Sequence, residues 1–378
     1  MLKARLQLSM RRIHDLVAFC LAYEFEDVVA EVTGADRIEP EDQSALEISR
    51  RAYKFLRLTT RSAHIAQALT PPPATVRLER SYDLFFPVFN HAHELFTLAT
   101  VPDWRARCRK AACFVSELWL HQLPGYLLEL LAQFDHVFLG VRHPVEEVAA
   151  ITGRPCSYLP LASDVLRFTP FPHPPPRSID VCSIGRRSAL THQALLDLAH
   201  ERRIFYFYDT VAASGAASKQ RTFRVDDPAG HRFLLASLLQ RSRYFIANRA
   251  RVNEPEFTSG RDEISSRFYE GIAAGTVMLG EPARTEEFRR HFDWPDAIIP
   301  LPFDAPDIAG VLKRLDEDPP RLERIRRDNL QNAALRHDWV YRIRAVFETL
   351  GLPPTEAMVA REERLKAVAA QAGVTRGA

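Results

Sequence analysis

Short apolar runs alternate with amphipathic segments along most of this chain, and this alternation limits the fold more than any other feature. Apolar runs of about four to eight residues are typical of strands buried on both faces of a parallel sheet. The segments between them place apolar residues at helical spacing, so the pattern predicts βαβ units and an α/β protein. The expected strands are residues 15–21, 82–89, 111–115, 136–141, 156–159, 179–184, 204–208, 244–247, 276–279 and 297–299, and the longer expected helices are 44–69, 307–335 and 339–350.

A Pro-rich stretch divides the alternation into two halves. Residues 169–176 read TPFPHPPP, with five prolines in eight residues, which is typical of a stiff, extended linker. A chain of 378 residues is long enough for two domains. We predict a first domain over 1–168, a linker over 169–176, a second domain over 177–336, and closing helices over 337–378 that could cross back to the first domain. A cleft between two such halves is the expected ligand site.

Composition excludes several classes of protein. The 50 basic and 48 acidic residues nearly cancel, so no strong field favours nucleic acid or a membrane. The five cysteines form an odd set without a C-x-x-C motif, which predicts neither a disulfide framework nor a metal site and favours a reducing, cytoplasmic location. No run of about 18 apolar residues predicts a membrane span, although the sequence leaves peripheral membrane contact open.

Several familiar catalytic motifs are missing. The chain has no G-x-G-x-x-G after a strand, no Walker A loop and no G-x-S-x-G. Dinucleotide oxidoreductases, P-loop enzymes and α/β-hydrolases are therefore disfavoured. Asp226 and Asp227 could pair on a metal, but Asp-Asp-Pro more often marks a turn before a helix. We predict no metal site.

The stretch 262–280, DEISSRFYEGIAAGTVMLG, predicts a short helix followed by a buried strand. Ser265 and Ser266 are good N-cap residues, and Gly275 is suited to end the helix. The free amides and positive dipole end at the start of such a helix would bind an anion such as a diphosphate.

Two charged side chains on this helix are candidates for ligand binding. Arg267 could bind negative charge, and Glu270, one turn into the helix, could accept hydrogen bonds from two ribose hydroxyls. The alternative is an ordinary helix and strand whose Arg and Glu are solvated. The stretch taken alone leaves both readings open.

Other polar residues follow predicted strands, where open α/β sheets bind ligands. Gly185 would let a phosphate approach the backbone, and Arg186 could bind it through two hydrogen bonds. His91 and His93 end a strand of the first half and are candidates for an acid, a base or a sugar ligand. Solvated surface groups are the alternative in each case. The further candidates are Glu117 and His121 and, more weakly, Arg142 and His143.

These motifs together resemble a known family. Residues 266–279, SRFYEGIAAGTVML, are similar to the C-terminal signature of GT-B glycosyltransferases of the group 1 type, especially the spore-coat-protein-like branch. Three more matches occur in the family's order. Residues 157–168 resemble the crossover between domains, residues 179–186 the first strand and Gly-Arg loop of the nucleotide domain, and His337 with Arg342 the closing helix.

The resemblance implies the GT-B fold, in which two Rossmann-like domains with parallel sheets face a central cleft. The first domain would bind an acceptor and the second a nucleotide sugar, such as a UDP- or GDP-sugar. It also implies retention of configuration, no metal and no tightly bound cofactor. Glu270 would bind the ribose, and Arg267 or Arg186 the diphosphate. A glycan, lipid, protein or small molecule all remain open as acceptor.

The chain departs from the family pattern at three places. The first acidic residue of the family, eight positions before Glu270, is Asp262 here, with Glu263 beside it. A family histidine is replaced by Ser116-Glu117, so its role could fall to Glu117, His121, His91 or His93. Ala22-Tyr23-Glu24 stand where a Gly-rich loop is expected after the first strand.

These departures keep other functions open. One alternative is a non-catalytic module of the same fold that binds a sugar nucleotide or a glycan. Another is a GT-B epimerase, which needs no acceptor. A phosphorylase with Lys-bound pyridoxal phosphate is disfavoured, because only six of the basic residues are lysines.

Overall fold

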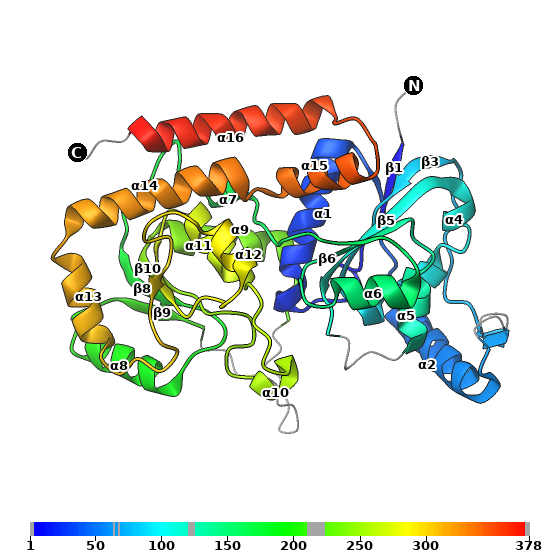
Figure 1. The fold of residues 1–378 in the computed structure, drawn as a ribbon, viewed down its shortest axis with the longest axis horizontal. Coiled ribbons are helices and arrows are strands. Elements are labelled where there is room, and N and C mark those ends of the chain that lie inside the picture. Colours follow the sequence, from blue (N-terminus) through cyan, green and yellow to red (C-terminus); the bar gives the residue numbers. More distant parts are fainter. Residues whose placement is uncertain (1–3, 63–64, 67–68, 120–124, 210–223, 375–378) are drawn as a thin grey trace. The chain divides into compact units, whose positions relative to one another are not determined.

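The computed structural model describes residues 4–62, 65–66, 69–119, 125–209 and 224–374. The chain forms two compact units, each built around a parallel sheet (Figure 1). The α/β class predicted from the alternation is confirmed. Unit 1 comprises Met1–Pro160, Arg224–Pro228 and Ala345–Ala357, and unit 2 comprises Leu161–Phe223, Ala229–Arg344 and Met358–Ala378. Residues 169–176 thus lie in unit 2.

In the described part of unit 1, seven strands form a sheet in the order β2-β1-β3-β5-β6-β7, with β4 also pairing with β5. All these pairings are parallel. The strands are β1 (Arg5–Leu8), β2 (Asp36–Ile38), β3 (Tyr82–Phe85), β4 (Val88–His91), β5 (Cys108–Glu117), β6 (His136–Leu139) and β7 (Cys156–Tyr158). The helices are η1 (Val17–Phe19), α1 (Cys20–Thr33), α2 (Gln43–Thr60), η2 (Ala92–Thr100), α4 (Trp104–Arg107), α5 (Gly125–Leu131) and α6 (Val145–Thr152).

The prediction of a first strand over 15–21 is wrong. Residues 17–19 form η1, and Cys20 begins α1. The apolar run continues into Phe25, Val28 and Val32, which are buried at helical spacing. This helical pattern extends over more residues than the short apolar run, and the segment therefore forms a helix. The first strand is β1, and the loop after it spans residues 9–16. Ala22-Tyr23-Glu24 therefore lie inside α1 and not in that loop.

Two other predicted elements of unit 1 have different bounds. The single strand expected over 82–89 is divided into β3 and β4, because Pro87 has no amide hydrogen for the ladder. The helix expected over 44–69 ends at Thr60, where Arg61 adopts the left-handed conformation at φ 55°.

In the described part of unit 2, five strands form a parallel sheet in the order β12-β11-β10-β8-β9. The strands are β8 (Ile179–Ser183), β9 (Tyr206–Tyr208), β10 (Ser242–Ile246), β11 (Val277–Gly280) and β12 (Ile299–Pro300). The helices are α7 (Val165–Phe168), α8 (Ala189–His200), α9 (Pro228–Gln240), α10 (Pro255–Thr258), α11 (Ser266–Ala273), α12 (Glu286–His291), α13 (Ile308–Asp316), α14 (Pro319–Arg336) and α16 (Glu356–Val374). Helix α15 (Trp339–Thr349) precedes α16. The helix expected over 307–335 is two helices, because Pro319 begins a new one.

A buried ion-pair network ties the end of the chain into unit 2. Arg361 of α16 donates from Nη2 to Asp164 Oδ1 at 2.5 Å and from Nε to Asp338 Oδ1 at 2.8 Å. All three side chains are buried. Asp164 also caps α7. Figure 1 shows α16 running beside α14, where Gln331 Nε2 donates to the Ala369 carbonyl at 3.3 Å.

His337 and Arg342, which carried part of the family resemblance, are also buried in unit 2. His337 Nε2 lies 2.9 Å from the His291 carbonyl oxygen, and Arg342 donates to the Leu161 carbonyl at 3.0 Å. Burial and the charge of Arg342 hold the pKa of His337 well below its ordinary value. This pair therefore joins the crossover to the closing helices as a neutral histidine and a charged arginine.

The described residues contain neither a membrane-spanning helix nor a metal-binding cluster. No helix there is long and apolar enough to cross a bilayer. No three His, Cys, Asp or Glu side chains there lie together as a potential metal-binding group.

Candidate active site

The predicted helix and strand of residues 262–280 are confirmed in unit 2. Ser265 is the N-cap of α11, and its Oγ accepts a hydrogen bond from the Arg267 amide at 3.4 Å. Ser266 is the first residue of the helix. Gly275 follows the helix at φ +63°, as expected for a residue that ends a helix in the left-handed region. Strand β11 comes directly after.

Glu270 lies in the core of unit 2, only 1% exposed. Arg267 Nη1 donates to its Oε2 at 2.8 Å, and Arg232 of α9 donates to its Oε1. Burial alone would raise the pKa of Glu270, but the charges and hydrogen bonds of the two arginines outweigh it and lower the pKa to about 2. The carboxylate is therefore ionised, and each of its oxygens is bound to an arginine.

The sequence analysis missed Arg232, which is 3% exposed. Nothing in the local pattern of α9 separates a buried arginine from the many exposed ones. A partner 38 positions away becomes visible only when the two helices are packed together.

The Gly185-Arg186-Arg187 loop follows β8. Gly185 has φ +90°, and its amide donates to Asp209 Oδ1 at 3.0 Å. Arg187 is also bound to Asp209, whose carbonyl accepts from its Nη2 at 2.8 Å. Arg186 is more exposed and donates to Glu254 Oε1 at 3.0 Å. Arg186 and Arg187 line a narrow recess at the carboxyl ends of β8 and β10, which Tyr206 of β9 also lines.

Asp262, the candidate for the first acidic residue of the family pattern, precedes α11. Arg249 Nη1 lies 3.2 Å from its Oδ1, and the Arg284 amide donates to its Oδ2 at 3.0 Å. Glu263 beside it is buried. Asp262 thus links the segments that follow β10 and β11.

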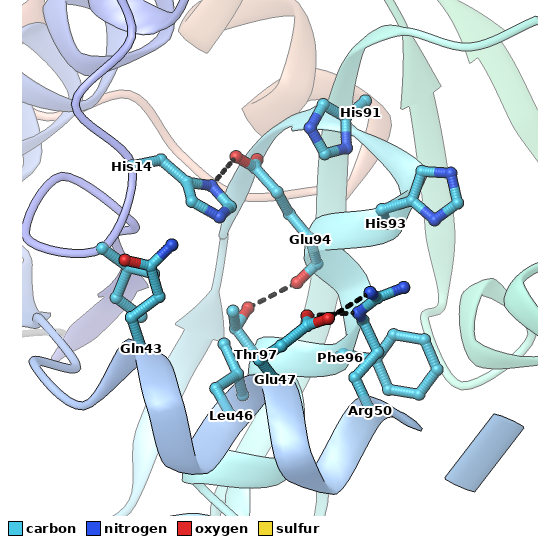
Figure 2. Close-up of a pocket in the computed structure, with 11 residues that line it drawn as sticks. His14, Gln43, Leu46, Glu47, Arg50, His91, His93, Glu94, Phe96 and Thr97 are labelled. Atoms are coloured by element: carbon cyan, nitrogen blue, oxygen red, sulfur yellow. Dashed lines mark hydrogen bonds and ion pairs between the residues drawn. The ribbon is translucent and has the colours of Figure 1, made fainter. Parts of the chain in front are cut away.

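Unit 1 contains a pocket of about 300 Å³. Figure 2 shows side chains of α2, of η2 and of the loop after β1 around it. Most of the lining residues are polar or charged, and the three apolar side chains are two from helices and one from the loop. The lining residues are Ile13, His14, Gln43, Leu46, Glu47, Arg50, His91, His93, Glu94, Phe96 and Thr97.

A histidine and a buried carboxylate meet in this pocket. His14 Nδ1 lies 2.7 Å from Glu94 Oε1, as Figure 2 shows. The Glu94 side chain is inaccessible to solvent. Asn90 orients it, because the Asn90 amide donates to Glu94 Oε2 at 2.6 Å and Asn90 Nδ2 donates to Oε1 at 3.3 Å.

This arrangement can act as a general base. When His14 Nδ1 donates its proton to Glu94, the lone pair is on Nε2. A carboxylate held in this way stabilises the imidazolium that forms when Nε2 takes a proton. Neither residue was predicted from the sequence. The first strand was expected at 15–21, so the loop that carries His14 was not recognised. Glu94 stands next to His93 in the sequence, and that proximity was the one signal available.

The predicted His91 and His93 also line the pocket. The His91 ring lies 6.2 Å from that of His14 and 5.7 Å from that of His93, between ring centroids. His91 Nδ1 is buried and has no hydrogen-bond partner among the described residues. Partial burial lowers the pKa of His93, and the nearby His91 and Arg50 act in the same direction. His93 is therefore neutral near pH 7.

The other predicted acid, Glu117, is paired with His91 in the register of β4 and β5. Its Oε1 accepts a hydrogen bond from Trp119 Nε1 at 2.7 Å. It is absent from the residues that line the pocket. His121, proposed alongside it, lies outside the described residues.

Part of the sequence and the whole fold are similar to those of known glycosyltransferases. Residues 209–348 match the model of a family described as glycosyl transferase-like. A glycosyltransferase from Rickettsia africae ESF-5 aligns over 92% of this chain and 97% of its own, with a TM-score of 0.51 and 8% sequence identity. The glycotransferase of kitacinnamycin aligns over 93% and 98%, with a TM-score of 0.37 and 12% identity. A search of curated proteins gave no match.

The similarity to the Rickettsia structure shows the fold alone. The family match covers unit 2 from Ala229 to Arg344 and continues to residue 348, inside α15. The predicted fold class is confirmed. The chain has the GT-B fold of glycosyltransferases, and this fold and its glycosyl transferase-like segment together support a glycosyl-transferring enzyme.

Proposed function

We propose that this protein transfers a glycosyl group from a nucleotide-sugar donor to a hydroxyl of an acceptor. Unit 2 binds the donor and unit 1 the acceptor, without a metal or a tightly bound cofactor. The observation that carries the proposal is the His14–Glu94 pair in the unit 1 pocket. The family match over residues 209–348 supports the assignment of the donor to unit 2. Membership of the spore-coat-protein-like branch stays a prediction.

The donor diphosphate has two groups of ligands in this proposal. One is the N-terminus of α11 with Arg267, and the other is the loop of Gly185 and Arg186. Helix amides and arginines favour the charge that the diphosphate gains on leaving. Arg186 is held by a single partly exposed carboxylate, Glu254, so a diphosphate could replace that partner with little loss.

Glu270 stays a proposed ligand of the ribose. Its two oxygens already accept hydrogen bonds from Arg232 and Arg267. Each carboxylate oxygen has a second lone pair, so a ribose hydroxyl could add to these bonds once it reaches the carboxylate. Glu270 also holds Arg267 in place for the diphosphate.

The chemistry requires one proton transfer. The acceptor oxygen attacks the anomeric carbon while His14 Nε2 takes its proton, and Glu94 stabilises the imidazolium. The bond between the anomeric carbon and the diphosphate oxygen breaks, and its electron pair leaves with the diphosphate. Arg267 and Arg186 neutralise that charge.

The transfer could either retain or invert the configuration of the anomeric carbon. The family resemblance implies retention of configuration. A histidine base beside the acceptor favours direct displacement, which inverts the anomeric carbon, because a single attack from the opposite face needs a base on the attacking oxygen. We therefore propose inversion. Nuclear magnetic resonance of the product would give its anomeric configuration, and a retained configuration would contradict the role of His14.

The donor must be identified before transfer can be assayed. A thermal-shift panel of UDP, GDP, ADP, TDP and CMP should show selective stabilisation by one nucleotide. Tight binding of a nucleoside diphosphate with no turnover of any sugar donor would favour the non-catalytic module instead.

The assay of the base uses His14→Ala and Glu94→Gln, with His173→Ala as the matched control on an exposed histidine. We expect His14→Ala to lower kcat by about 10²- to 10⁴-fold, with nucleotide binding unchanged. The control should keep full activity. Unchanged turnover in His14→Ala would exclude it as the base.

A further inference from the structure

Helix α2 exposes large apolar side chains to solvent in unit 1. Ile48, Phe55 and Leu58 are 61%, 67% and 64% exposed. Ile65, Leu69 and Val76, which follow the helix in the chain, are exposed as well. These six are a large share of the fourteen exposed large apolar side chains in the described residues. Such clustering marks an interaction surface, whereas scattered exposed residues need no explanation.

Basic residues are interleaved with this apolar surface. Ile48, Phe55 and Leu58 lie on one face of α2 at helical spacing, and Arg51 and Lys54 are exposed on the same side. We call these five residues the α2 outer face. The helix has one acidic residue, Glu47, and that carboxylate is bound to Arg50 and Arg51 at 2.6 and 2.8 Å. Glu47 is thus shared between two arginines, and Glu47, Arg50, Arg51 and Lys54 together keep a net positive charge beside the apolar side chains.

The side of the same helix next to the outer face lines the pocket of His14, and the Glu47–Arg51 ion pair lies between the two. Gln43, Leu46, Glu47 and Arg50 of α2 are among the pocket residues, and Figure 2 shows them below the His14 ring. Figure 1 shows α2 on the outside of unit 1. One helix thus carries the exposed surface and one wall of the proposed acceptor site.

We propose that the α2 outer face lies on an anionic bilayer and that the pocket takes its acceptor hydroxyl from a lipid-borne molecule. The second part rests on the proposed function, and the first does not. An amphipathic helix with apolar residues and interleaved Lys and Arg binds at the bilayer interface, with its apolar side chains between the headgroups. The cations are attracted to the anionic headgroups, and their long side chains reach them while the apolar groups insert.

Charge disfavours a second copy of the chain as the occupant. In a twofold dimer the same surface meets itself. The net positive charge of Arg50, Arg51, Lys54 and Glu47 would then meet its own copy, because Glu47 is the one acidic residue of the helix and is shared by two arginines. A bilayer with anionic headgroups supplies the missing negative charge.

Flotation of the full chain with vesicles tests the docking. The vesicles are phosphatidylcholine alone, or phosphatidylcholine with about one third phosphatidylglycerol. We expect wild type to float with the anionic vesicles and to be released by high salt. The triple variant Ile48→Ser/Phe55→Ser/Leu58→Ser and the double variant Arg51→Gln/Lys54→Gln should each bind at least tenfold more weakly. The matched control is Phe233→Ser/Leu234→Ser, which removes two equally exposed apolar side chains from α9 and should bind as wild type does.

Three results would overturn the docking. Wild type that does not float with anionic vesicles is one, and a triple variant that floats as well as wild type is another. The third is a wild-type dimer in gel filtration that the triple variant loses, which would make a second copy the occupant. Thermal shifts with nucleotides serve as the folding control, because the outer face is remote in sequence from unit 2 and should leave them unchanged.

The lipid-borne acceptor is tested with radiolabelled donor. Wild type incubated with vesicles of a total lipid extract should transfer label into the organic phase, and the triple variant should transfer at least tenfold less. Label that enters only water-soluble products would overturn the lipid acceptor while the docking stands. Flotation without any transfer would count against the proposed function alone.

Discussion

Glu270 shows how two opposing effects decide the state of one side chain. Burial disfavours its charge, whereas Arg267 and Arg232 favour it, and the net effect is a pKa of about 2 against an ordinary value of 4.5. The folded state therefore binds this proton more weakly than the unfolded state. The resulting stabilisation is fully present above about pH 5 and is lost as the pH falls towards 2.

The variant Glu270→Gln should lose this contribution. We expect a loss of about 3–5 kcal/mol at pH 7, because the buried Arg232 and the partly exposed Arg267 are left without their counter-charge. The difference in free energy of unfolding between wild type and variant should shrink as the pH falls from about 5 to 2. Denaturant unfolding at a series of pH values measures both.

Glu254→Gln is the matched control, because Glu254 also binds two arginines but at a partly exposed site. Its loss should stay within about 1 kcal/mol. A gap between wild type and Glu270→Gln that is equal at pH 7 and pH 3 would contradict the assignment.

Residues of the site were predictable where their partners are local. Ser265 and Arg267 belong to one helix turn with Glu270, so the capped helix and its charged face followed from the sequence. His14 and Glu94 are 80 positions apart, and no local pattern connects them. The histidines His91 and His93 were predicted because they follow a strand, and they line the same pocket.

At the scale of elements, the end of β11 closely approaches the backbone that follows β10. Gly280 has φ +152°, and a Cβ added there would lie 1.7 Å from the Ala247 carbonyl oxygen. Only a backbone shift in β10 or β11 could relieve that contact.

We expect Gly280→Ala to destabilise unit 2 by at least about 3 kcal/mol, because it adds a clash with backbone to an unfavourable conformation. Gly260→Ala is the control, since its φ is +72° with no atom near the added Cβ. That change should cost about 1 kcal/mol. Thermal unfolding of the two variants measures the difference, and equal losses would argue against the close approach.

The start of α14 offers a test of helix capping. Asp318 Oδ1 accepts a hydrogen bond from the Arg321 amide at 3.1 Å, whereas Asp307, at the same position before α13, makes no such bond. Asp318→Ala should therefore cost about 1 kcal/mol, and Asp307→Ala should cost less. Urea midpoints of the two variants decide it, and the reverse order would refute the role of the cap.

At the scale of the whole molecule, the last helix is held by one buried arginine. Arg361 binds Asp164 at the start of unit 2 and Asp338 near its end. The network joins segments 197 positions apart, so it depends on the packing of distant parts of the unit.

Arg361→Met should cost about 3–5 kcal/mol, because it removes the charged partner of the buried Asp338 and one of the two arginines bound to the buried Asp164. Arg364→Met, one turn further along α16 and exposed, should change stability by less than about 0.5 kcal/mol. The triple change Arg361→Met/Asp164→Asn/Asp338→Asn should recover much of the loss, since no buried charge remains. Calorimetry of the three variants would detect this order, and a triple variant no more stable than Arg361→Met would contradict it.

The sequence by itself determined the α/β class, most strand and helix positions and the capped helix α11. These depend on hydrophobic periodicity and on caps, which act over a few residues. Only the tertiary structure decided where the first strand lies, that Arg232 neutralises Glu270, and that His14 meets Glu94. Each of these depends on which distant segments pack together, and the resulting loss of solvent gives their charges and hydrogen bonds an effect that no local pattern records.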